Sequence, residues 1–264
     1  MNRRQTLLAF TAAGSVGLPL KALADDALKA AINGAHRSPK EKARDPYRRP
    51  EAALTFWGLK PGMTIVEISP GSGYWLEILA PYAHATKGKY ITTGAATAFA
   101  DRLANPVYGQ STFTPFTLTS GPLAPAGSAD IVLTARNIHN WLWQPGMLDK
   151  AMKDFHDVLK PGGILAVEEH RADPRPETVA GGRVASDGYV ATKTVIDAAT
   201  KAGFRLDAQS ELNANPKDTK DYPGGVWTLP PNNRAPNPLP PGFDPEVYKA
   251  IGESDRMTLR FKKA

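Results

Sequence analysis

Short apolar segments alternate with longer amphipathic segments along most of the chain. The short segments are rich in β-branched residues, a composition that predicts buried strands. The predicted strands are 63–68, 88–93, 111–118, 130–135, 164–168, 204–212 and 257–261. Pro115 weakens the third of them, because proline cannot donate a hydrogen bond to a neighbouring strand.

The longer segments carry apolar residues at spacings of three and four positions, which predicts helices that bury one face. The predicted helices are 25–32, 50–57, 73–80, 145–159 and 190–202. Pro50 suits the first turn of its helix. The stretch 44–50 before it contains two prolines and predicts a turn.

Alternation of strands and helices predicts one α/β domain with a doubly wound, mainly parallel sheet covered on both faces. The domain would span 25–264, with 25–57 as a helical cover. The segment 213–255 is different, because 9 of the 24 prolines fall between Pro216 and Pro245. It predicts a long, irregular, proline-rich insertion before the last strand.

Residues 1–24 have the composition of an export signal peptide. Arg3 and Arg4 precede a short apolar stretch, and a small-x-small cleavage site ends at Ala24. The apolar stretch is too short for a stable membrane anchor, and the arginine pair resembles a twin-arginine signal. We therefore expect the twin-arginine export machinery as a partner and a periplasmic mature chain that starts at Asp25, with no membrane contact after signal removal.

Part of the net charge of +6 comes from this N-terminal segment. The segment contains three basic residues and no acid, which leaves 29 basic against 26 acidic residues, or +3. With so mild an excess and no basic run, nucleic acid is not an expected partner. The absence of cysteine excludes disulfides, thiolate metal sites and a cysteine nucleophile.

An acidic residue near the end of the predicted strand 63–68 is followed by a glycine-rich turn. The run from Glu67 to Tyr74 reads E-I-S-P-G-S-G-Y. Its glycines let the backbone approach a ligand closely, and the first turn of the next helix offers free N–H groups. Leu76 stands where a dinucleotide motif has its third glycine, so a nicotinamide or flavin site is disfavoured.

A second motif lies at 159–165, where L-K-P-G-G-I-L leads into an apolar strand. It resembles the turn into the fifth strand of class I S-adenosylmethionine-dependent methyltransferases, whose strand-end acid and G-x-G match Glu67, Gly71 and Gly73. The run A-G-F at 202–204 resembles the entry to their sixth strand. Together with the signal, the R-D-P-Y-R-R-P stretch and the S-D-R run at 254–256, the chain is similar to exported predicted methyltransferases of unassigned substrate.

This resemblance implies a Rossmann-like methyltransferase fold with S-adenosylmethionine as the cofactor. The implied cofactor-binding residues are Glu67, Pro70, Gly71, Ser72, Gly73, Tyr74 and Asn137. The chain departs from the family pattern at Ser69, which takes the first glycine position, and at 92–95, where no acid ends the second strand. Arg48 and Arg49 are either ligands for the cofactor carboxylate or part of a solvated face.

Three candidate catalytic residues follow the fourth and fifth strands, whose carboxyl ends meet at one edge of a parallel sheet. His139 is a candidate general base, and Glu169 and His170 are candidates for a base and its orienting partner. The same side chains offer an alternative carboxylate–imidazole metal set, although no metal is the leading expectation. Trp141 and Trp143 are expected to be lid or core aromatics.

The leading hypothesis is an S-adenosylmethionine-dependent methyltransferase that acts on a small-molecule substrate. The protein would align the acceptor with the methyl group and exclude water. Two alternatives stay open. One is an exported small-molecule-binding protein with this fold and no methyl transfer, and the other is a metal-assisted hydrolase.

Overall fold

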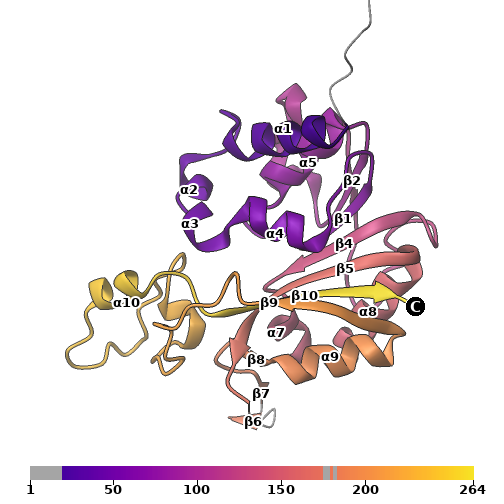
Figure 1. Ribbon diagram of the computed structural model, residues 1–264. Coiled ribbons are helices and arrows are strands. Elements are labelled where there is room, and N and C mark those ends of the chain that lie inside the picture. The colour runs from indigo at the N-terminus through magenta and orange to yellow at the C-terminus, as the bar shows by residue number, and fades with distance from the viewer. Residues whose placement is uncertain (1–19, 175–178, 181–182) are drawn as a thin grey trace, which may run out of the picture.

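The computed structural model describes residues 20–174, 179–180 and 183–264 (Figure 1). Its main sheet confirms the predicted α/β class. The strands are β1 (Thr64–Ile68), β2 (Lys89–Thr93), β3 (Ser111–Thr114), β4 (Ala129–Ala135), β5 (Leu159–Ala172), β8 (Val190–Ala191), β9 (Phe204–Ser210) and β10 (Arg256–Lys263). A separate two-stranded ribbon pairs β6 (Val179–Ala180) with β7 (Arg183–Val184).

The main sheet has the strand order β3-β2-β1-β4-β5-β10-β9. Strands β1 to β5 pair in parallel, and β10 is antiparallel to both of its neighbours. The order reverses direction between β1 and β4, which lie side by side although β2 and β3 separate them in sequence. In open α/β sheets, ligands bind beyond the carboxyl ends of the strands at such a point.

Helices cover both faces of the sheet, as Figure 1 shows, with α1, α4 and α5 on one side and α8 and α9 on the other. The α-helices are α1 (Leu20–Asn33), α2 (Pro39–Lys42), α3 (Asp45–Arg48), α4 (Pro50–Trp57), α5 (Leu76–Ala85), α6 (Ala100–Leu103), α7 (Ile138–Leu142), α8 (Met147–Val158), α9 (Thr192–Lys201) and α10 (Pro245–Ile251). Short 3-10 turns are η1 (Ala96–Phe99), η2 (Pro106–Tyr108) and η3 (Gly225–Thr228).

Successive residues of the central strands enter two separate hydrophobic cores. In β1, Ile65 packs with α4 and α5, whereas Val66 packs with α8 on the other face. In β4, Ile131 and Val132 divide in the same way. Both faces of the sheet are therefore buried, and this is why these strands read as continuous apolar runs instead of alternating ones.

Several predicted boundaries are wrong for local reasons. The predicted turn at 44–50 contains the short helix α3, which ends because Arg49 adopts the left-handed conformation with a φ of 45°. The predicted helix 73–80 begins only at Leu76, after a series of turns. The strand predicted at 111–118 ends at Thr114, immediately before Pro115.

Short helices occupy both the predicted N-terminal cover and the predicted insertion, which contains η3 and α10. The cover comprises α1 to α4, and α1 begins at Leu20, so it runs across the predicted cleavage position after Ala24. The rest of the predicted signal, 1–19, lies outside the described residues. Within the described part of the chain, no helix combines the length and apolar character needed to cross a bilayer.

Candidate active site

A cavity of about 350 Å³ opens at the carboxyl ends of β1 and β4. The loop after β1 forms one wall, and the residues that follow β4 form the opposite wall. The N-terminal cover contributes Lys40, Arg44 and Arg48 to the lining, and the insertion contributes Trp227 and Pro231. Both accessory segments therefore help to build the cavity that the sheet topology creates.

The loop after β1 presents backbone to this cavity. Gly71 lines it with a φ of 59°, and a Cβ atom at this position would meet no atom within 4 Å. Among the described residues, the N–H groups of Gly71 and Ser72 find no hydrogen-bond acceptor. Gly73 does not line the cavity; its φ of 93° is a conformation that residues with a side chain rarely adopt.

Glu67 lies at the base of the cavity but is already bonded to the neighbouring strand. The hydroxyl of Tyr90 on β2 donates to its Oε2 at 2.5 Å, and the glutamate is only 2% exposed. Burial raises the pKa of Glu67 to about 8, although the Tyr90 hydrogen bond and Arg48 oppose that shift. The predicted cofactor contact is therefore a carboxyl group that is mostly neutral at pH 7.

Two other predicted cofactor residues carry structural bonds in addition to lining the cavity. Tyr74 donates its hydroxyl to Asp45 at 2.7 Å and so ties the loop to α3. Asn137 donates through Nδ2 to the carbonyl of Ile68 at 2.9 Å and fixes the end of β1 against the end of β4. Pro70 and Ser72 line the cavity as predicted.

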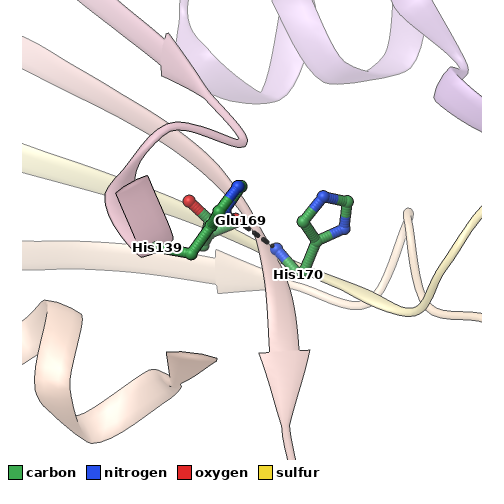
Figure 2. A group of neighbouring side chains, drawn as sticks. All are labelled: His139, Glu169 and His170. Carbon is green, nitrogen blue, oxygen red and sulfur yellow. Dashed lines mark hydrogen bonds and ion pairs between the residues drawn. The ribbon is translucent and has the colours of Figure 1, made fainter. Parts of the chain in front are cut away.

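His139 and Glu169 form a buried imidazole–carboxylate pair. Nδ1 of His139 lies 3.0 Å from Oε1 of Glu169, and Figure 2 shows the two side chains together, one from α7 and the other from β5. Glu169 also accepts the backbone N–H groups of Ile138, at 2.6 Å, and of His170, at 2.8 Å. Both carboxylate oxygens are thus occupied, and the histidine ring is held at the cavity wall.

His170 lines the same cavity but contacts Glu169 only through its backbone N–H. Its Nδ1 lies 2.5 Å from the Ser254 hydroxyl. Burial, with His139 and Arg136 nearby, holds the pKa of His170 well below its ordinary value, so the ring is neutral. The partnership expected between Glu169 and His170 is therefore replaced by one between Glu169 and His139.

The same three residues bring their ligand atoms within 4.8 Å of one another, as a metal set requires. In this arrangement, however, both oxygens of Glu169 accept hydrogen bonds. The geometry thus supports the acid–base alternative directly, and metal binding would require those bonds to be exchanged.

Comparison with known proteins adds to this geometry. Residues 66–167 match the family model described as a methyltransferase domain. This segment is a methyltransferase domain. Among curated proteins, none matches the sequence significantly.

Solved structures share the fold across most of the chain. A SAM-dependent methyltransferase from Aquifex aeolicus is 16% identical, with a TM-score of 0.56 over 91% of this chain and 98% of that one. The 4+2 cyclase SpnF is 18% identical, with a TM-score of 0.59 over 88% and 85%. CrArsM, an arsenic(III) methyltransferase from Chlamydomonas reinhardtii, is 17% identical, with a TM-score of 0.50 over 90% and 73%. Residues 66–167 thus match a methyltransferase domain, and the chain shares the fold of these solved structures.

An arginine cluster joins the N-terminal cover to the segment just before β10. Arg44 and Arg48 place their Nε atoms 2.7 and 3.0 Å from the carboxylate of Glu253, and all three residues are buried. Arg48 lines the cavity, as the ligand alternative requires, whereas Arg49 is exposed, as on a solvated face, and donates to the carbonyl of Leu212. The R-D-P-Y-R-R-P stretch and the segment around Ser254 thus meet in space, a pairing that sequence analysis missed.

The tryptophan side chains around α7 separate into two groups. Trp141 belongs to the core, where its ring packs against Phe116 and Phe155. Trp143 lies near the active site, with its ring centroid 5.6 Å from that of His139. Trp227 of the insertion completes this second group, 5.8 Å from His139 and 5.7 Å from Trp143. The insertion therefore covers the candidate base.

Proposed function

We propose that this protein transfers a methyl group from S-adenosylmethionine to a small-molecule acceptor bound in the cavity beyond β1 and β4. One observation carries the proposal. A loop with unpaired backbone N–H groups and His139, whose ring is paired with Glu169 behind it, line opposite walls of a single cavity at the point where strand order reverses.

The residues present suit the donor. The open space at Gly71 allows close approach, and the N–H groups of Gly71 and Ser72 are free to bind a polar ligand. Asn137 stands on the opposite side of the cavity. When bound, S-adenosylmethionine supplies a methyl carbon that its sulfonium already activates, so the protein has mainly to align and to exclude water.

His139 is the proposed general base. If Nδ1–H of the ring donates to Glu169, Nε2 is left as a proton acceptor, and the carboxylate stabilises the imidazolium that forms. An acceptor hydroxyl or amine would give its proton to Nε2 while its oxygen or nitrogen bonds to the methyl carbon and the carbon–sulfur bond breaks. The products are the methylated acceptor and S-adenosylhomocysteine.

Calorimetric titration of the mature chain with S-adenosylmethionine tests donor binding. Incubation with donor labelled in the methyl group and a small-molecule extract, followed by mass spectrometry, tests transfer. Saturable binding and a labelled product are the expected results. Binding without a labelled product would instead favour a ligand-binding protein with this fold, and absence of donor binding would contradict the proposal.

We also propose export through the twin-arginine route, which moves folded proteins and would let a bound donor travel with the protein. The support lies in the sequence of 1–24 alone. Replacing Arg3→Lys and Arg4→Lys together should retain the chain in the cytoplasm, as cell fractionation would reveal. Replacing Arg49→Lys and Arg205→Lys, both exposed, in a second chain controls for loss of two arginines elsewhere. Unchanged export of the first variant would refute this route.

A further inference from the structure

Cationic side chains dominate the lining of the candidate active site. The cavity is lined by Lys40, Arg44, Arg48 and Arg136, whereas Glu67 is the one carboxyl group among its described lining residues. Because the pKa of Glu67 is raised to about 8, that group offsets little of the positive charge at pH 7. The cavity wall therefore carries an excess of positive charge.

The ion pairs behind the wall do not include Arg136. Glu253 accepts from Arg44, Arg48 and Arg256. Arg44 also pairs with Glu41, and Arg256 with Glu168. In the described part of the chain, no carboxylate forms an ion pair with Arg136, whereas Arg44, Arg48 and Arg256 all have such partners. Arg136 is thus a partly buried cation with no carboxylate in contact, an arrangement that is costly unless a ligand supplies the negative charge.

Arg136 also has an unusual backbone conformation. It follows β4 directly with a left-handed φ of 60°, a conformation that is strained for a residue other than glycine. Its buried Nε has no hydrogen-bond partner within the described part of the chain, and one buried Nη2 atom on each of Arg44 and Arg48 is equally unpartnered. Three guanidinium groups at one cavity therefore have N–H donors without hydrogen-bond partners.

The methyl donor does not supply this negative charge. Its amino-acid end carries one carboxylate and one ammonium group, and its sulfonium adds a further positive charge. Binding it brings a net positive charge into a cavity that is already cationic. The acceptor is the remaining source of negative charge in the reaction.

We propose that the methyl acceptor is an anion and that Arg136 binds its carboxylate or phosphate group beside His139. This inference rests on the proposed methyl transfer and names its substrate class. Arginine suits the task because its planar fork matches two oxygens of either group, and bonds between ionised partners are the stronger kind. The anionic group would fix the acceptor so that its nucleophile faces the base.

Anion binding to the protein saturated with S-adenosylhomocysteine tests this assignment. Inorganic phosphate and benzoate serve as probes in separate calorimetric titrations, and the probe that binds more tightly identifies phosphate or carboxylate as the preferred group. Arg136→Gly removes the guanidinium and relieves the left-handed strain, so this variant should fold. Lys87→Gly is the matched control, because Lys87 has a φ of 59° and an exposed side chain away from the cavity.

The expected result is anion binding that weakens by at least about tenfold in Arg136→Gly and is unchanged in Lys87→Gly, while both variants keep the affinity for S-adenosylhomocysteine. Competition between the anion and S-adenosylhomocysteine would overturn the inference, since Arg136 would then hold the donor's carboxylate. Equal anion binding by Arg136→Gly would also overturn it. If S-adenosylhomocysteine does not bind but the anion still binds through Arg136, the result supports the anion site and contradicts the proposed methyl transfer.

Discussion

Nδ1 of His139 lies 3.0 Å from Oε1 of Glu169, and neither side chain is more than 5% exposed. The carboxylate is held in turn by two backbone N–H groups, one from the start of α7 and one from β5. The ring is therefore fixed by a group that is itself fixed, which is the arrangement that lets a histidine present one nitrogen to a substrate.

Replacing Glu169→Gln should slow methyl transfer much more than it weakens donor binding. The amide nitrogen would face the donors that now meet a carboxylate, and it could not stabilise an imidazolium. We expect a loss of about 10²-fold or more in the rate of labelled-product formation and a loss of about 1–3 kcal/mol in the free energy of unfolding. Glu211→Gln, on an exposed ion pair, is the control. An unchanged rate in Glu169→Gln would remove the pair from the mechanism.

Replacing Gly71→Arg should block the donor without preventing folding. The site is open, so the new side chain would extend into the cavity, and the left-handed φ would cost about 1–2 kcal/mol of stability. Gly162→Arg is closely matched, since Gly162 has a φ of 73° and open space but lies outside the cavity. Calorimetry should show donor affinity reduced by at least about tenfold in the first variant alone. Equal affinities in the two variants would place the donor elsewhere.

The sheet and the loop after β1 could be predicted because their signals are local. Apolar runs mark the strands, and glycines mark a turn that needs a left-handed backbone. His139 and Glu169 could be brought together because parallel strands align their carboxyl ends. The sequence could not show that Glu169 pairs with His139 and not with His170. Glu169 and His170 are neighbours in sequence, and the side-chain contact of Glu169 depends on which face of β5 each side chain occupies.

The cationic wall could not be predicted, because its parts are distant in the sequence. Arg44 and Glu253 are 209 positions apart, and their contact depends on how the N-terminal cover packs against the start of β10. Trp227 lies in a proline-rich segment without helical or strand periodicity, so the sequence does not indicate which way its side chain points. The short helix α3 was missed because four residues carry too little pattern, and Arg49 ends it through a backbone conformation that arginine rarely adopts.

The raised pKa of Glu67 predicts a stability that depends on pH. Its folded pKa of about 8 exceeds the ordinary value of 4.5, so the stabilisation is complete below pH 4.5 and is lost as pH rises towards 8. Glu67→Gln keeps an acceptor for Tyr90 and cannot ionise. Relative to the parent, it should therefore gain up to roughly 1.4 kcal/mol per pH unit between pH 5 and 7.

Urea unfolding at pH 5, 6, 7 and 8 measures this difference. Glu246→Gln on the exposed face of α10 provides the baseline, because its surface ion pair with Lys249 contributes at most about 1 kcal/mol. Parallel curves for the parent and Glu67→Gln across this range would show that the buried carboxyl group ionises as it does in the unfolded chain.

The ring of Trp227 should itself shield the candidate active site from water, apart from any effect of the insertion's overall stability. Its ring packs against those of His139 and Trp143, so Trp227→Ala would open the cavity to water beside the base. We expect affinity for S-adenosylhomocysteine to fall by about tenfold, whereas Trp227→Phe retains most of it. Tyr248→Ala is the control, because Tyr248 stacks on Phe243 within the same insertion and does not line the cavity. If Tyr248→Ala weakens binding as much as Trp227→Ala does, the insertion acts through its overall stability, and the specific role of Trp227 is wrong.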